Sequence, residues 1–405
     1  MRLIKWLFGI AIILAVLIAL LPIAGRHYAI YWFEQNGYDA KIQALRFNPL
    51  TGKLTLLGLD VAKTADQGVK VEKLEATIKL TQLLQKELII RTLKTEGVRW
   101  DLGHAETNLT RITSPFERFI SRYMPAWRFD VVSSVHDNAE LCRTGALDPQ
   151  RLTVNGQPSF KRSSQCLNIG NATIIGINVQ NTAKGWQLTT RSTTTFKRID
   201  FKDYAQGASL IYVASLELDD VLLDKTESRI GQLALQSFYL VERNQPSDDR
   251  LDAPYQTQIQ NLLINNVSLV RARQENALLN TNRMNIEAIE VTALRQTLHR
   301  NRQADFVMAE RLMQAFPALS TLFNPPSETY PKGQKFTLTV LKTRVIDGGV
   351  AWLDDSVSPP AQEALSGLSL ELGRVDSGEP ELRAPIRGDG ALGERGSVQI
   401  EGFIA

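Results

Sequence analysis

The side chains that could carry out chemistry are few and widely spaced in this chain of 405 residues. None of the four histidines stands at metal-ligand spacing from another histidine or from a cysteine. The chain contains neither a G-x-S-x-G nucleophile elbow nor a G-x-x-x-x-G-K phosphate-binding loop. The sequence therefore predicts a protein that is not an enzyme, with no catalytic residue, no metal ligand and no cofactor.

Two clusters of charged residues allow a ligand-binding interpretation. Asp347, Asp354 and Asp355 could hold a cation, although solvated acids flanking a turn are the simpler interpretation. A basic cluster could contact lipid phosphates, although a solvated helix face is again simpler; its members are Arg295, His299, Arg300 and Arg302. We therefore favour a solvated role for both clusters.

The chain has only two cysteines, Cys142 and Cys166. Outside the cytoplasm they could form a disulfide. Closing a loop of that length stabilises a fold by about 3.5 kcal/mol on the chain-entropy model. Two buried free thiols are the alternative.

The element that must position the rest of the chain is the first one. Between Lys5 and Arg26 the chain carries no charge. About 20 apolar residues in a helix span a bilayer. We expect an uncleaved anchor helix rather than a signal peptide, because the apolar run is longer than a signal-peptide core of roughly 7–15 residues. The helix should end near Gly37, and its marker residues are Trp6, Leu14, Leu20 and Trp32.

The charges that flank this anchor predict its orientation. Arg2 and Lys5 precede the span, so the N-terminus should remain in the cytoplasm. The chain would then cross the inner (plasma) membrane once, and the bulk of it would lie in the periplasm. The net charge of +3, from 46 basic and 43 acidic residues, gives no sign of a nucleic-acid partner.

Beyond the anchor, apolar residues recur with a period of two. The alternating sets are Leu54, Leu56, Leu59 and Val61; Leu74, Ala76, Ile78 and Leu80; Phe336, Leu338 and Val340; and Leu368, Leu370 and Leu372. Such alternation predicts short strands with one dry face and one wet face. The fold class should therefore be mainly β.

A short motif recurs within this β pattern. Two turn-forming or polar residues precede a Val or Ala, a spacer and a large apolar residue. The copies begin at Glu96, Gly170, Asp219, Asn265 and Gly348. We interpret the motif as strand, tight turn, strand. Its spacing varies, so it is not a fixed-period solenoid.

Two segments break the β pattern. A capping box with proline at the first helical position predicts a helix over about 114–124. A second helix is expected over about 302–316. Both should pack over the end of a sheet. A polar loop is expected over 244–254, and a proline-rich linker over 324–331.

The start and end of the chain resemble AsmA-like proteins, in particular a large bacterial branch of unknown function. The resemblance rests on residues 37–40, 45–52 and 54–61 directly after the anchor, then on 74–80, 83–84, 88–90, Leu93 and Trp100, and at the end on 345–355, 359–360, 368–375 and 388–402. It covers about a third of the chain, and its motifs are structural turns and strands.

The resemblance implies an elongated, curled antiparallel sheet with an apolar concave face, anchored in the inner membrane. We expect four parts: an anchor helix (1–37), an AsmA-like N-terminal β unit (38–102), a central β region with helical insertions (103–330) and a C-terminal β unit (331–405). The apolar face should form a lipid groove, and its candidate lining residues are Leu54, Leu56, Leu74, Ile78, Val98 and Trp100.

The function implied by the resemblance is the handling or transfer of phospholipid, or another acyl lipid, for outer-membrane and envelope maintenance. The alternative is an envelope scaffold or assembly factor that binds partner proteins through its sheet edges. Alternation shows only that one sheet face is dry. It does not show whether that face is an open groove or a closed core.

Overall fold

The computed structural model describes residues 22–64, 67–102, 127–144, 164–182, 185–203, 208–224, 227–240, 257–272, 280–300, 302, 334–379, 381–393 and 395–404. Strands dominate these residues, as the alternation predicted. The expectation of short strands was wrong, because most strands have between 10 and 21 residues. The chain divides into two compact units. Unit 1 is Met1–Thr182 with Thr190–Ala208, and unit 2 is Ala183–Thr189 with Ser209–Ala405.

The described part of unit 1 begins with a helix over residues 22–35. It ends as predicted: Gly37 takes a left-handed φ of 81° and its N–H donates to the carbonyl of Glu34. No helix in the described residues is long and apolar enough to span a bilayer. The predicted anchor residues Trp6, Leu14 and Leu20 lie outside the described residues.

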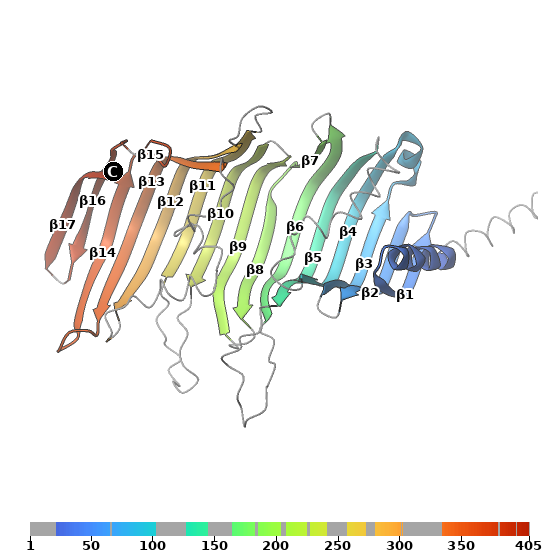
Figure 1. The fold of residues 1–405 in the computed structure, drawn as a ribbon, viewed down its shortest axis with the longest axis horizontal. Helices are drawn as coiled ribbons and strands as arrows, with labels where there is room; N and C mark the ends of the chain where they lie inside the picture. The colour runs from blue at the N-terminus through green and yellow to red at the C-terminus, as the bar shows by residue number, and fades with distance from the viewer. Residues whose placement is uncertain are drawn as a thin grey trace, which may run out of the picture. The chain divides into compact units, whose positions relative to one another are not determined.

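The strands of unit 1 lie side by side in a single ladder (Figure 1). Their spatial order follows the chain. They are β1 (Asp39–Asn48), β2 (Lys53–Thr64), β3 (Gln67–Ile78), β4 (Glu87–Leu102), β5 (Arg128–Thr144), β6 (Ser164–Thr182) and β8 (Thr194–Asp203), with the 3-10 helix η1 (Leu80–Gln85) between β3 and β4.

Unit 2 forms a comparable ladder, which starts with β7 beside β9 and then follows the chain. Its strands are β7 (Gly185–Thr190), β9 (Ala208–Leu223), β10 (Glu227–Leu240), β11 (Thr257–Ala272), β12 (Asn280–Arg300), β13 (Gln334–Asp354), β14 (Ala361–Leu372), β15 (Val375–Asp376), β16 (Ala384–Leu392) and β17 (Gly396–Ile404). The two-residue β15 pairs with β13.

The pairing is mixed, so the expectation of a purely antiparallel sheet was wrong. Strands β4 and β5 pair in parallel in unit 1, and β12 and β13 do so in unit 2. A parallel pair needs a long crossover between its strands. The segments 103–127 and 301–333 separate these pairs in the chain. Alternation could not reveal this, because it fixes the face that a side chain takes and not the direction of the neighbouring strand.

Several sequence predictions fall on residues that the structure does not describe. They are the helices over 114–124 and 302–316, the loop over 244–254 and the linker over 324–331. The boundaries expected near residues 102 and 330 fall inside the two compact units, next to the long segments just named.

The apolar alternation changes phase within single strands. In β3, Val71 and Ala76 are both buried, at 7% and 4% exposed. Five residues of regular strand would put them on opposite faces. The apolar positions change from odd (Val69, Val71) to even (Leu74, Ala76) on either side of Glu72. One face of the sheet therefore stays apolar along the whole strand.

The residues at these phase changes lie opposite one another on neighbouring strands, and we call each such row a crease. One row crosses unit 1: Gln43, Gly58, Glu72, Gly97, Asn138, Gly170 and Arg198. A second row of unit 1 contains Arg91, Val132 and Gly176. The two rows of unit 2 are Asp220, Gly231, Asn266, Glu287 and Leu341, and Ala214, Ser237, Gln260, Ala293 and Asp347.

The two creases lie six residues apart in every strand that carries both, as Arg91 and Gly97 do in β4. In these strands the second crease residue in chain order has a positive φ. These residues are Gly97, Asn138, Gly176, Asp220, Ser237, Asn266, Ala293 and Asp347. A left-handed residue interrupts the pleat and bends the strand, so each crease is a local feature of the backbone.

The recurring sequence motif lies at the creases and not in turns between strands. Four copies contain a crease residue (Gly97, Gly170, Asp220 or Asn266), and the fifth directly follows the crease residue Asp347. Its copies lie inside β4, β6, β9, β11 and β13, so our interpretation as strand, tight turn, strand was wrong. The reason is physical: Gly, Asn and Asp tolerate left-handed φ in a turn and in the middle of a strand alike. At Gly97, a Cβ atom would also overlap the side chain of Glu72.

Candidate functional site: the apolar face between the creases

The strip of apolar face between the two creases is the most uniform surface of unit 2. We call it the unit 2 panel. Cross-strand pairs such as Leu233 with Leu218, and Leu235 with Leu262, place its residues side by side. The panel consists of Leu216, Leu218, Leu233, Leu235, Leu262, Ile264, Ile289, Val291, Thr343, Val345, Leu370 and Leu372. All of them except Thr343 are aliphatic.

This panel is not a closed core in the part of the chain that the structure describes. Val345 is buried at 8% exposed, and the other panel residues are half-buried. Elsewhere among the described residues, aliphatic side chains such as Ile42, Val71 and Ile286 are buried, at 3%, 7% and 7% exposed, so the half-buried panel differs from an enclosed core. A contiguous apolar strip of this kind is typical of a surface that binds apolar groups.

The corresponding strip of unit 1, the unit 1 panel, is apolar over most of its strands. Its apolar members are Leu45, Phe47, Leu54, Leu56, Leu74, Ala76, Leu93, Ala172, Ile174 and Phe196. Four polar residues interrupt it on β4, β5 and β8. These are Thr95, Ser134, His136 and Thr194, and we call them the polar island.

The sequence placed part of this surface correctly in its strands. Leu54, Leu56 and Leu74 lie in the unit 1 panel, where Leu56 pairs directly with Leu74. Ile78 lies at the panel edge. Val98 and Trp100 lie beyond the Gly97 crease, paired with Val71 and Val69. All six predicted lining residues are half-buried.

Sequence reasoning placed Leu370 and Leu372 on an apolar strand face but missed the rest of the unit 2 panel and the polar island. Both could have been found from whether the apolar residues stand at odd or at even sequence positions along each strand. In β10, for example, the apolar residues are Ile230, then Leu233 and Leu235, then Phe238 and Leu240. A search for a phase change after every sixth residue would have found the panels.

Within the polar island, the side chains of His136 and Thr95 form a hydrogen bond of 2.7 Å between Nδ1 and Oγ1. The Ser134 hydroxyl donates to the carbonyl of Ile174 at 3.3 Å. Thr194 is 4% exposed, and its hydroxyl has no hydrogen-bond partner among the described residues. Burial lowers the pKa of His136, which outweighs the opposing effect of Asp137 and keeps the imidazole neutral near pH 7.

The helix over residues 22–35 reaches the edge of the unit 1 panel. A Cβ atom on Gly25 would lie 3.5 Å from Cδ2 of Leu45, a panel residue on β1. The ring of Phe33 contacts that of Tyr38, with centroids 6.4 Å apart, where the helix leads into β1. The helix that precedes the sheet therefore contacts the apolar face directly.

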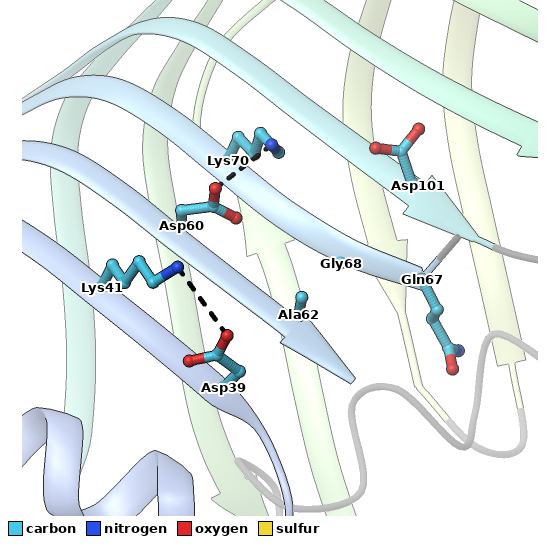
Figure 2. Close-up of a pocket in the computed structure, with 8 residues that line it drawn as sticks. All are labelled: Asp39, Lys41, Asp60, Ala62, Gln67, Gly68, Lys70 and Asp101. Carbon is cyan, nitrogen blue, oxygen red and sulfur yellow. Dashed lines mark ion pairs between the residues drawn. The ribbon is translucent and has the colours of Figure 1, made fainter. Parts of the chain in front are cut away.

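The opposite face of unit 1 carries charge. A polar hollow of about 160 Å³ lies over β1 to β4. Figure 2 shows the residues that line it, which include three aspartates and two lysines as well as Ala62, Gln67 and Gly68. Lys70 pairs with Asp60 at 3.1 Å and Lys41 with Asp39 at 4.0 Å, while Asp101 pairs with Arg99 at 3.1 Å. Because these charges neutralise one another at the surface, we interpret the hollow as a solvated face.

The acidic cluster that could have held a cation is paired with the basic cluster instead. Asp347 pairs with Arg295 at 2.9 Å, and Asp355 pairs with His299 at 2.9 Å. Arg300 lies 3.6 Å from Asp354. The basic residues 295, 299 and 300 lie on strand β12, so their assignment to a helix was wrong.

Cys142 and Cys166 are directly opposite on β5 and β6 and form a disulfide on the charged face of unit 1. They are 2% and 0% exposed. With Glu140 they also make up the one group of three potential metal ligands found among the described residues. Because both sulfur atoms are used in the disulfide, this group does not form a metal site.

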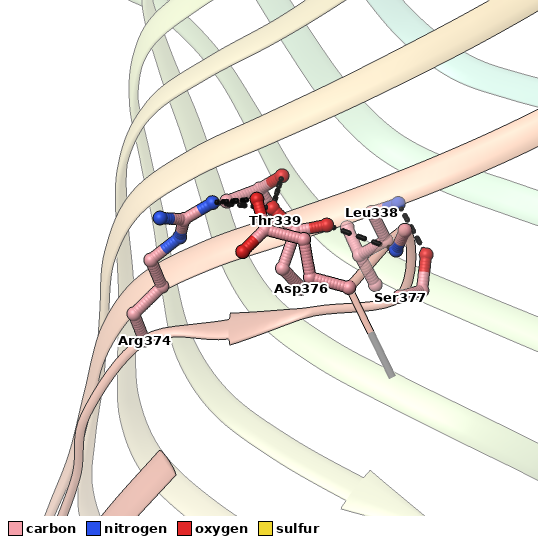
Figure 3. Close-up of polar contacts among 7 residues, drawn as sticks. Leu338, Thr339, Arg374, Asp376 and Ser377 are labelled. Atoms are coloured by element: carbon pink, nitrogen blue, oxygen red, sulfur yellow. Dashed lines mark hydrogen bonds and ion pairs between the residues drawn. The ribbon is translucent and has the colours of Figure 1, made fainter. Parts of the chain in front are cut away.

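A polar network fixes β15 to β13 in unit 2, as Figure 3 shows. Asp376 accepts hydrogen bonds from Arg374 at 2.8 Å and from Thr339 at 3.0 Å. The hydroxyl of Ser377 accepts one from the N–H of Leu338 at 2.8 Å. The bond from Arg374 lowers the pKa of Asp376. This network completes the edge of β13 beyond its pairing with β14.

No family model matches the chain, and no curated protein matches it.

Proposed function

We propose that this protein is a non-enzymatic lipid-handling protein of the AsmA-like type, tethered to the inner membrane with most of its chain in the periplasm. The apolar face of each creased unit would serve as a trough for acyl chains. The observation that carries the proposal is the unit 2 panel, a strip that is aliphatic at every position except Thr343 and whose side chains, apart from Val345, are half-buried.

The energetic reason is the cost of moving a lipid through water. Each methylene exposed to water costs about 0.8 kcal/mol, so a two-chain lipid pays on the order of 20 kcal/mol. A strip of leucine, isoleucine and valine side chains removes much of that cost. The same contact also buries the part of the strip's own side chains that is still exposed, which adds to the favourable free energy of binding.

Two further features support the location. The disulfide between Cys142 and Cys166 is typical of an oxidising compartment outside the cytoplasm. The helix over residues 22–35 contacts the apolar face at Leu45. An anchor that continues this helix toward the N-terminus would bring the membrane to the entrance of the trough.

The test compares two adjacent leucines on β11. Leu262 lies on the panel, opposite Leu235, whereas Leu263 lies on the other face, opposite Ala234. Both are half-buried. We expect Leu262→Glu to remove most bound phospholipid from the purified full chain, measured by lipid mass spectrometry, and Leu263→Glu to retain it.

The comparison between the variants is the readout, because the anchor itself carries lipid in both. Thermal unfolding of the two variants controls for loss of the fold. Equal lipid content in two folded variants would contradict the proposal. That outcome would favour the scaffold that binds protein partners through its sheet edges.

A further inference from the structure

The polar island places hydrogen-bonding groups on a face that is otherwise built for apolar contact. The ladders pair Thr95 of β4 with His136 of β5, so these two island residues are adjacent. Thr194 on β8 lies one strand further along, because β6 with Ala172 and Ile174 stands between β5 and β8. On one side the island borders the apolar residues of β1 to β3, through the pair Leu74 with Thr95. An amphiphile lying across this boundary would meet both surfaces at once.

Two groups of the island have hydrogen-bonding capacity to spare. The Nδ1 atom of His136 is engaged by Thr95. In the tautomer whose Nδ1 accepts from the Thr95 hydroxyl, Nε2 of the half-buried, neutral imidazole carries the proton and is a donor. The hydroxyl of Thr194 is more than nine-tenths buried and unpartnered among the described residues. A buried donor without an acceptor is unfavourable, so a ligand oxygen at this position would relieve a cost that the fold carries.

The charge of the site restricts the ligand. None of the positions that we assign to the unit 1 panel is occupied by Lys, Arg, Asp or Glu. The lowered pKa of His136 keeps its ring uncharged. A neutral apolar surface disfavours a phosphate, which needs a compensating positive charge, and accepts a neutral carbonyl oxygen.

We propose that the polar island binds the ester carbonyls of an acyl-glycerol lipid whose acyl chains lie on the apolar panel residues of β1 to β3. The inference rests on the proposed lipid-handling function and adds a chemical class of ligand and a position for it. His136 and Thr194 donate to the ester oxygens. Ser134 supports the strand pairing, because its hydroxyl donates to Ile174 and its side chain is 0% exposed.

Binding without hydrolysis follows from the same geometry. The Ser134 hydroxyl is bonded to a backbone carbonyl and not to the imidazole. The Nδ1 atom of His136 is engaged by Thr95. A serine held in this way lacks the adjacent base that would activate it as a nucleophile.

The test uses a pair of lipids that differ only in the ester. The full chain in detergent micelles binds a fluorescent phospholipid, which is displaced by dioleoyl phosphatidylethanolamine or by its dialkyl ether analogue. The ether analogue has the same chains and head group but no carbonyl oxygen. We expect the ester lipid to bind about fivefold to 25-fold more tightly, since each neutral hydrogen bond contributes about fivefold.

Variants assign the preference to the island. Thr194→Val and His136→Phe should each reduce the ester preference about fivefold and leave the affinity for the ether lipid unchanged. His136→Gln keeps an N–H donor and should retain part of the preference. Thr194→Val changes volume very little, so it keeps the test valid if the His136 variants fail to fold.

The outcomes separate this inference from the function on which it depends. Equal affinity of the unaltered chain for both lipids, or an ester preference that survives in the folded variants, overturns the island proposal alone. Failure of both lipids to displace the fluorescent phospholipid at any concentration overturns it together with the proposed function.

Discussion

The two units share the same arrangement of strands and creases but differ in the side chains that lie between the creases. Each has a run of antiparallel strands, then one parallel pair, and two creases that divide the sheet into strips. Between the creases, unit 2 presents aliphatic side chains at every panel position except Thr343, whereas unit 1 presents the polar island. The difference teaches that the creases determine the architecture and the panel residues determine what the surface can bind.

The disulfide gives the largest expected difference between the units. Reducing the bond between Cys142 and Cys166 should lower the stability of unit 1 by about 3.5 kcal/mol, because the unfolded chain gains the freedom of the opened loop. Hydrogen exchange should then report faster opening of β5 and β6, with β10 and β11 unchanged. The double variant Cys142→Ser, Cys166→Ser is the control, since reductant should have no further effect on it.

The creases should respond alike in the two units. Gly97→Val in unit 1 and Asn266→Val in unit 2 each force a β-branched residue into a left-handed φ, at +62° and +49°. Both should lose about 1–3 kcal/mol of unfolding free energy, measured by urea denaturation.

The opposite substitution is the control for crease strain. Ala293 has a φ of +52°, so Ala293→Gly should gain about 0.5–1 kcal/mol, the relief of strain less the added chain entropy of glycine. A loss of stability in that variant would contradict our account of the crease.

Making the unit 1 panel more like the unit 2 panel should stabilise it in the absence of ligand. Thr194→Val removes a buried hydroxyl that lacks an acceptor, so the free energy of unfolding should rise by about 1 kcal/mol. Thermal unfolding of the delipidated protein measures this. Thr195→Val, on the other face of the same strand, should change stability less, and equal effects would count against the orientation of Thr194.

The polar island should also make unit 1 sensitive to mild acid. The unfolded His136 has a pKa of 6.5 and the folded one a lower pKa. As the pH falls below about 6.5, the unfolded chain binds a proton before the folded chain does, so stability decreases. His136→Phe should remove this slope from the pH dependence of unfolding of unit 1, and persistence of the slope would locate it elsewhere.

The smallest effect should come from Asp376 in unit 2. The hydrogen bond from Arg374 lowers the folded pKa of this carboxyl below its unfolded value of 3.8. The stabilisation is therefore complete above pH 3.8 and is lost as the pH falls through the folded pKa. Asp376→Asn removes the same charge permanently. At neutral pH, the Leu338 amide of this variant should exchange hydrogen as fast as that of the unaltered protein does in strong acid.

The strands could be predicted from the sequence because their apolar residues alternate. Leu74, Ala76, Ile78 and Leu80 were assigned to one strand for this reason. The structure places the first three in β3, whereas Leu80 begins the helix η1, so that part of the prediction was wrong. The helix end at Gly37 was predicted from the conformational freedom of glycine. Both features are local, and short-range physical preferences are sufficient to find them.

The features that sequence reasoning missed depend on long-range pairing. Nothing near Glu87 shows that β4 pairs in parallel with a strand that begins at Arg128. Asn266 favours a left-handed φ equally in a hairpin and in a crease, so its neighbours could not decide between them. The polar island was missed because His136 and Thr95 become adjacent only when β4 and β5 pair.

The six-residue interval between creases also restricts how such a chain can change in length. One extra residue between Gly231 and Ser237 would turn the following side chains to the wrong side of the sheet, carrying Phe238 and Leu240 into water and Tyr239 inward. Two extra residues would keep every side chain on its own face, although the crease at Ser237 would move out of line with Ala214 and Gln260 on the neighbouring strands. Insertions and deletions within these strands should therefore be tolerated in even numbers, whereas single steps should be confined to the connections between strands.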